Sequence, residues 1–134
     1  LTPSPGLDEL DDLVDTHRLA HGPVRLQVDP AIVCESSSVR LVTYRVVQEA
    51  LTNIGRHAPG AAATVTVRLT DAHVEVVVED DGRAPVPPPP SRSEGGLGLI
   101  GMRERVSLHG GHLDTAAVPT GGFRVHAQLA RVAP

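Results

Sequence analysis

The hydrophobic positions of the chain follow two periods, one typical of helices and one typical of strands. Apolar residues return every three or four positions over 7–20 and from about 39 to 58, which predicts two amphipathic helices. A third, shorter helix is predicted from about Gly98 to His109. Strict alternation of apolar and polar residues instead predicts strands at 24–28, 65–69, 74–78, around Leu113 and at 123–129.

Residues that end helices or form turns separate these elements. Ser36–Ser38 offer N-caps for the second helix, and Pro59-Gly60 ends it. Asp71-Ala72 lies between two of the strands and predicts a hairpin. The segment 81–96 is rich in glycine and holds four consecutive prolines, so it is expected to be a surface loop.

The alternating strands imply a sheet with one buried and one wet face, and the helices must cover the buried face. We therefore expect a two-layer α/β sandwich, with a mixed, mostly antiparallel sheet and helices on one face. A chain of 134 residues fits one domain with one core, so residues 1–134 are expected to form a single domain.

The composition is that of an ordinary soluble protein and narrows the range of partners. The net charge of −4 gives no reason to expect contact with nucleic acid or with a membrane surface. No apolar run is long enough for a membrane span, and no signal peptide is recognised, so a cytoplasmic location is expected. Cys34, the only cysteine, is expected to be a small, at least half-buried apolar residue. The first residue is Leu1 and not Met, which indicates a piece of a longer protein.

One polar stripe lies along the second predicted helix. Glu49, Asn53 and His57 follow one another at intervals of four residues, so they share one helix face. A carboxylate, a carboxamide and an imidazole in line suit a magnesium–phosphate site, because Mg²⁺ prefers oxygen ligands and keeps several waters. The same stripe is also what an ordinary solvated helix face would show, and both interpretations remain open.

Two further segments have the composition of a binding site. Val76–Gly82 is a strand that delivers acidic residues into a glycine turn, although an ordinary Asp-Gly turn reads the same way. Gly95–Val106 joins a glycine-rich stretch to a helix, and a helix N-terminus favours phosphate. This stretch follows a loop and lacks Gly-Lys-Ser/Thr, so it is neither a Rossmann fingerprint nor a Walker loop.

Taken in order, the three segments resemble the ATP-binding module of bacterial sensor histidine kinases, which has the Bergerat fold. The resemblance is carried by QEALTNIGRHA at 48–58, VEDDG at 78–82 and GLGLIGMRERV at 96–106. It is most similar to the nitrate-sensor and desaturase-regulator branch of these kinases, and it runs from about residue 7 to residue 130.

The resemblance implies ATP and Mg²⁺ as cofactors and assigns roles to individual residues. Glu49 would be the general base or would position the acceptor, and Asn53 would ligate Mg²⁺. Asp80 would accept a hydrogen bond from the adenine amino group, and Gly82 would let the base approach. Arg56 and His57 would face the phosphates. Gly96, Gly98 and Leu99 would bind the nucleotide from the glycine segment. Residues 83–95 would form the ATP lid.

The implied activity is transfer of the γ-phosphoryl group of ATP to a histidine. In this family the acceptor histidine is followed by Asp or Glu, and none of the seven histidines here is. The acceptor is therefore expected on the kinase's own dimerisation and phosphoacceptor domain, with a response regulator downstream.

Two alternatives remain beside this interpretation. A serine kinase of the anti-sigma-factor type uses a similar module, although the GMRERV helix argues against it. A decayed site that serves only to dock partners is the other. Its support is Ala84, which stands where the family usually has glycine, and alanine disfavours positive φ.

Overall fold

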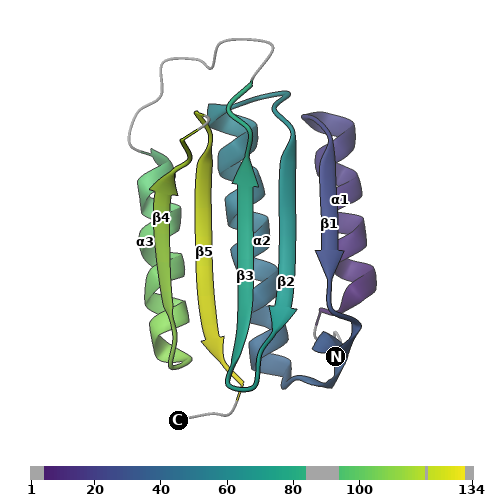
Figure 1. The fold of residues 1–134 in the computed structure, drawn as a ribbon, viewed down its shortest axis with the longest axis vertical. Coiled ribbons are helices and arrows are strands. Elements are labelled where there is room, and N and C mark those ends of the chain that lie inside the picture. Colours follow the sequence, from purple (N-terminus) through teal and green to yellow (C-terminus); the bar gives the residue numbers. More distant parts are fainter. Residues whose placement is uncertain (1–4, 84–93, 120, 132–134) are drawn as a thin grey trace.

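The computed structural model describes residues 5–83, 94–119 and 121–131. Within them lie three α-helices, one 3₁₀ helix and a sheet of five strands (Figure 1). No helix in these ranges is both long and apolar enough to cross a membrane. In chain order the elements are α1 (Leu7–Ala20), β1 (Val24–Val28), η1 (Pro30–Cys34), α2 (Ser37–His57), β2 (Ala63–Leu69), β3 (His73–Asp80), α3 (Glu94–Leu108), β4 (His112–Ala117) and β5 (Phe123–Ala130).

The sheet has the strand order β1-β2-β3-β5-β4 and is mixed, as the sequence predicts. β1 and β2 are parallel, and every other neighbouring pair is antiparallel. A parallel pair needs a crossover connection, and here α2 makes it. Figure 1 shows the three helices side by side on one face of the sheet, which confirms the two-layer α/β sandwich.

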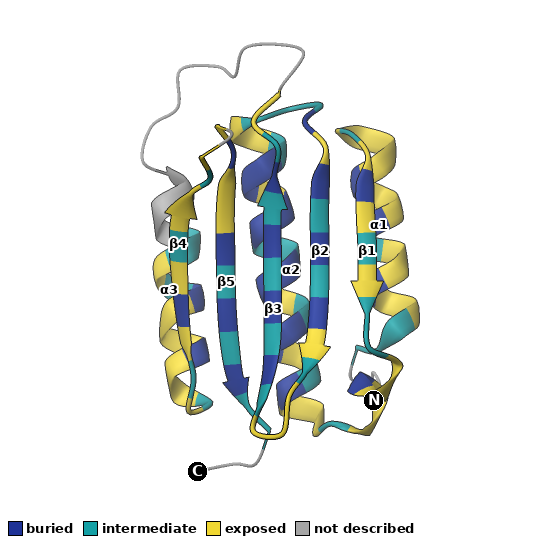
Figure 2. Cartoon of the chain, in the orientation of Figure 1, coloured by how far each residue is buried: buried dark blue, intermediate teal, exposed yellow. Residues whose placement is uncertain are grey.

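The core lies between α2 and the central strands. Val65 on β2, Val76 on β3 and Ala127 on β5 are completely buried at alternate positions along their strands (Figure 2). Val47 on α2 is buried against them in the same cluster. The opposite face of the sheet is polar, and side chains on neighbouring strands form ion pairs across it, such as Arg124 with Glu79 at 2.9 Å.

The long helix α2 begins where its cap predicts. The Ser36 hydroxyl accepts a hydrogen bond from the Val39 N–H at 3.2 Å, which satisfies one of the free donors of the first turn. The helix ends at His57, just before Pro59-Gly60, and Gly60 has a φ of 87° that suits the turn. These two signals set the length of the helix that carries most of the predicted site.

At three places the structure differs from the sequence-based expectation. α3 begins at Glu94 and not near Gly98, so Gly95, Gly96 and Gly98 are helical. The buried residues Met102 and Val106 hold this helix against the core, and that tertiary packing outweighs the low helix propensity of glycine. Nothing in the sequence pattern predicted η1. Cys34 at its end is exposed and not half-buried.

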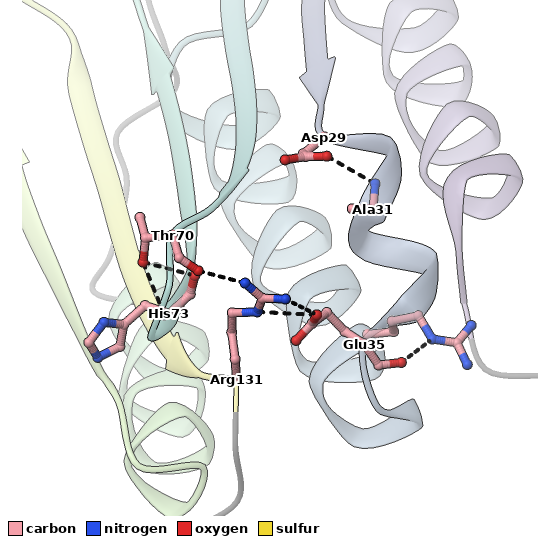
Figure 3. Close-up of polar contacts among 7 residues, drawn as sticks. Asp29, Ala31, Glu35, Thr70, His73 and Arg131 are labelled. Atoms are coloured by element: carbon pink, nitrogen blue, oxygen red, sulfur yellow. Dashed lines mark hydrogen bonds and ion pairs between the residues drawn. The ribbon is translucent and has the colours of Figure 1, made fainter.

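An ion pair joins two segments at the end of the sheet where both ends of the described chain lie. The Arg131 guanidinium, just after β5, contacts the Glu35 carboxylate at 3.0 Å, and the Glu35 side chain is only 6% exposed (Figure 3). The same guanidinium donates to the Thr70 carbonyl at 2.7 Å, in the β2–β3 turn. Arg131 therefore ties three segments together at the end opposite the candidate site (Figure 1).

Candidate functional site

The predicted site residues lie toward the opposite end of the strands from the Arg131–Glu35 ion pair. There the C-terminal end of α2, the end of β3 and the beginnings of α3 and β5 meet (Figure 1). Glu49 and Asn53 come to this end on α2, Asp80 at the end of β3, and Gly98 on α3. The three segments that the sequence singled out thus come to the same end of the sheet, and two of them touch where Glu49 approaches Gly98. The proposed lid, 83–95, lies mostly outside the described residues, and Ala84 lies wholly outside them.

Asn53 is the least ordinary of these residues. Its side chain is 7% exposed, and neither its amide nitrogen nor its carbonyl oxygen has a hydrogen-bond partner among the described residues. A buried polar group without a partner costs roughly 1–3 kcal/mol, so such groups are uncommon unless a ligand completes them. The solvated-face interpretation of the α2 stripe therefore does not hold at Asn53.

Glu49 lies one turn before Asn53 and is half-buried against α3. Its carboxylate occupies the place that a Cβ at Gly98 would need, so the two helices meet here without a side chain from α3. A groove of about 280 Å³ runs beside this contact. Its lining is contributed by two helices: Arg45, Gln48 and Glu49 from α2, and Gly98, Gly101, Met102 and Arg105 from α3.

Asp80 is held firmly at the end of β3. It is 6% exposed, and one carboxylate oxygen accepts a hydrogen bond from the Gly82 N–H at 2.8 Å. The other oxygen accepts from the Phe123 N–H at 3.2 Å, across the turn that precedes β5. Each carboxylate oxygen has a second lone pair, so the group is oriented and can still accept another donor.

Gly82 is required at its position for two reasons. Its φ of 70° lies in the left-handed region, and a Cβ there would overlap the backbone of Gly121. The chain therefore leaves β3 in close contact with the turn before β5. The Gly82 N–H donates to the carboxylate of Asp80, two residues earlier, within this turn.

The remaining predicted positions do not line the groove beside Glu49. Arg56 and His57 are exposed in the last turn of α2, and Arg56 lines a second groove, between α1 and α2. Leu99 packs against the hydrophobic core. Gly96 lies in the first turn of α3, where backbone N–H groups have no partner within the helix. Contacts of these four residues with a nucleotide remain predictions.

The sequence analysis missed two residues of the groove. Arg45 and Gln48 were not singled out, although Arg45 lies four residues before Glu49 and so on the same helix face. Arg105 also lines the groove, whereas Arg103 on the same helix donates to the Leu113 carbonyl at 3.2 Å and serves the fold. In the described part of the chain, no group of three or more His, Cys, Asp or Glu residues could hold a metal ion.

Comparison with known proteins gives this arrangement its class. Residues 38–132 match the family described as histidine kinase-, DNA gyrase B-, and HSP90-like ATPases, and the chain belongs to this family. More particularly, it is the ATP-binding catalytic domain of a two-component sensor histidine kinase. The kinase/phosphatase UhpB of Salmonella typhimurium is 43% identical over 94 residues, which are 70% of this chain and 18% of that protein. The sensor histidine kinase YxjM of Bacillus subtilis is 34% identical over 109 residues, 79% of this chain and 26% of that protein.

Solved structures agree on the fold. The mycobacterial sensor histidine kinase MprB superposes with a TM-score of 0.67 at 23% identity, covering 95% of this chain and 96% of that one. The catalytic domain of the histidine kinase ThkA gives the same TM-score at 16% identity, covering 95% and 94%. The chain spans about a fifth to a quarter of the length of the curated relatives named above.

Proposed function

We propose that this domain binds Mg·ATP at the edge of the sheet and supplies the γ-phosphoryl group to a histidine on a separate dimerisation and phosphoacceptor domain. The observation that carries the proposal is Asn53, whose buried amide finds no partner among the described residues and lies one turn from Glu49. A ligand that brings both a donor and an acceptor to this amide would satisfy it, and hydrated Mg²⁺ with phosphate does so.

The donor set fits a magnesium ion that is shared with the nucleotide. The amide oxygen of Asn53 is a hard ligand and adds no negative charge beside the triphosphate. Mg²⁺ is commonly held by one or two protein groups together with substrate phosphates and water, so the absence of a larger ligand cluster in the described residues is compatible with it. Bound there, the ion would neutralise charge on the transferring phosphoryl group.

Asp80 is the proposed adenine-binding residue. Its carboxylate is fixed by the N–H groups of Gly82 and Phe123 and keeps lone pairs for the exocyclic amine of the base. Gly82 would contribute through its N–H, which orients this carboxylate, because the backbone of Gly121 takes the space that a side chain at Gly82 would need. The N-terminal turn of α3, with Gly96, would face the phosphates, where free N–H groups and the helix dipole favour an anion.

Glu49 is the proposed catalytic residue. It lies on the groove between α2 and α3, where an acceptor imidazole could meet the γ-phosphate. As a base it would take the proton from the attacking imidazole, or it would hold the ring in line for attack. Arg45 and Arg105 line the same groove, so the acceptor would approach Glu49 between two positive side chains.

The curated relatives support histidine as the acceptor, because they are named as histidine kinases. By this proposal the phosphoryl group passes on to a response regulator, and the domain works in the cytoplasm, where ATP is available. The serine-kinase alternative predicts a phosphoester that survives acid, whereas phosphohistidine is lost in acid.

Calorimetric titration of the domain with ATP, with and without Mg²⁺, tests the nucleotide half of the proposal. We expect ATP to bind, and binding to be tighter with Mg²⁺. No detectable binding under either condition would instead support a decayed site that only docks partners. Acid treatment of the phosphorylated full-length kinase then separates histidine from serine as the acceptor.

A further inference from the structure

A second groove lies between α1 and α2, on the other side of α2 from the groove beside Glu49. Its volume is about 300 Å³, which is at the lower end of the range for small-molecule sites. α1 contributes Leu13, His17 and His21, and α2 contributes Gly55 and Arg56. The proposed function uses none of the α1 residues.

His17 is buried in this groove without a hydrogen-bond partner. The residue is 6% exposed, and its Nε2 atom finds no partner among the described residues. Burial, and secondly the nearby His21, lower the pKa of His17 below its usual value. Its imidazole is therefore neutral at pH 7, and a neutral imidazole can carry its proton on Nε2 and donate it.

The ring of His21 lies over the backbone of α2 at Gly55, where no side chain stands in its way. A Cβ at Gly55 would come within 2.8 Å of the His21 Nε2 atom. The His21 ring also stacks obliquely on His17, with ring centroids 4.9 Å apart. The two imidazoles thus line one wall of the groove, one turn apart on α1.

No acidic side chain lines the groove. Among its lining residues the titratable ones are His17, His21 and Arg56, and all three are basic. The hydroxyls of Thr16 and Thr52 donate to carbonyls of their own helices, at 2.9 and 2.8 Å. The donors left to face a ligand are therefore the imidazoles and the guanidinium.

Apolar groups make up most of the remaining wall, chiefly Leu13, Ala20 and Leu51. From this combination we propose that the α1–α2 groove binds a small organic carboxylate, with the carboxylate at Arg56 and the two histidines and the apolar body against the leucines. A cation is disfavoured, because Arg56 would repel it and no acidic side chain lines the groove.

The probe for this site is benzoate, and its neutral isostere benzamide is the matched control. Titration of ¹⁵N-labelled domain by NMR should show benzoate shifting the Gly55 amide and the His17 and His21 ring nitrogens. The dissociation constant should be on the order of 1 mM, as for a small fragment. Benzamide should bind at least tenfold more weakly.

Two variants change the groove itself, and a third, outside the groove, is the control for loss of a positive charge. Arg56→Gln removes the guanidinium, and Gly55→Ala displaces the His21 ring, so each should weaken benzoate binding at least tenfold. Arg25→Gln removes one exposed positive charge on β1 and should leave binding unchanged. Should Gly55→Ala fail to fold, Arg56→Gln still decides the matter.

Three results would overturn the proposal. Equal binding of benzamide would make the groove merely apolar, and equal binding of inorganic phosphate would show that no apolar body is recognised. Shifts of His17 and His21 on addition of ZnCl₂, with none on addition of benzoate, would make the groove a metal site. Because Arg56 is also a predicted phosphate contact, ATP affinity of Arg56→Gln is measured beside benzoate binding. Loss of benzoate binding with ATP affinity kept, or the reverse, shows which of the two proposals has failed.

Discussion

The carboxylate of Glu49 fills the space that a side chain on residue 98 would need, so α2 and α3 touch at Gly98. Substituting Gly98 should therefore disturb the candidate catalytic residue directly. In Gly98→Ala the new Cβ overlaps the Glu49 carboxylate, and either the carboxylate or the start of α3 must move. We expect nucleotide affinity to fall several-fold, as measured by calorimetry.

Gly101→Ala is the matched control for this prediction. A Cβ at Gly101 meets nothing, and alanine is favoured over glycine in a helix by up to about 1 kcal/mol. That variant should unfold at higher urea concentration and should bind nucleotide normally. Equal nucleotide affinity in the two variants would show that the Glu49–Gly98 contact has no bearing on the site.

Asn53→Ala should separate phosphate binding from base binding. The variant loses the proposed ligand of Mg²⁺, so Mg·ATP affinity and phosphoryl transfer should fall while adenosine binding stays nearly intact. Because no described residue bonds to the amide, its removal should cost little of the free energy of unfolding. Calorimetry with Mg·ATP and with adenosine measures both affinities, and normal transfer by the variant in the full-length kinase would rule the role out.

Asp80→Asn should weaken ATP binding by roughly 1–3 kcal/mol, the scale of a hydrogen bond to a charged group. The substitution replaces one of the two acceptor oxygens that hold the N–H groups of Gly82 and Phe123, so thermal unfolding should be measured beside affinity. The unmodified domain should also prefer ATP to GTP, because a carboxylate repels the carbonyl oxygen of guanine. Equal affinity for the two nucleotides would contradict the adenine assignment.

Incubated alone with γ-labelled ATP, the chain should bind nucleotide and retain no stable label. None of its seven histidines is followed by Asp or Glu, and in-line transfer needs a positioned acceptor. Adding the dimerisation and phosphoacceptor domain in trans should restore labelling on the added domain. High concentrations will be needed, since the natural linkage supplies an effective concentration of about millimolar order. Acid-labile label on this chain alone would contradict the division of labour.

The stability of the domain should fall as the pH drops below about 6.5, in part because of His17. Burial lowers the pKa of His17 in the folded state, so the unfolded chain takes up this proton first and is favoured by acid. The contribution is fully present above the unfolded-state pKa and is lost as the pH falls below it. Urea unfolding from pH 8 to pH 5.5 should show a smaller pH slope in His17→Leu than in the unmodified domain. An unchanged slope would mean that His17 is not protonated on unfolding.

Sequence periodicity was sufficient for most of the fold. The alternation in β2, β3 and β5, the Ser36 cap and the Pro59-Gly60 stop predicted the elements, because each depends on local spacing or on one turn. The start of α3 was predicted four residues too late, because tertiary burial of Met102 and Val106 overrides the weak propensity of the glycines. The unsatisfied amide of Asn53 and the α1–α2 groove could not be predicted, since burial and the packing of two helices are not encoded in local spacing.

The segments at the two ends of the described chain lie at one end of the sheet, and α2 and β3 finish at the other (Figure 1). A fluorophore, an affinity tag or a surface tether attached beyond either end would therefore point away from the nucleotide edge. The domain could be immobilised beyond Arg131 for surface-based binding measurements without covering the candidate nucleotide site. Because Arg131 anchors that end to Glu35 and Thr70, a pulling force applied there would load the ion pair and the hairpin turn before it reached α2.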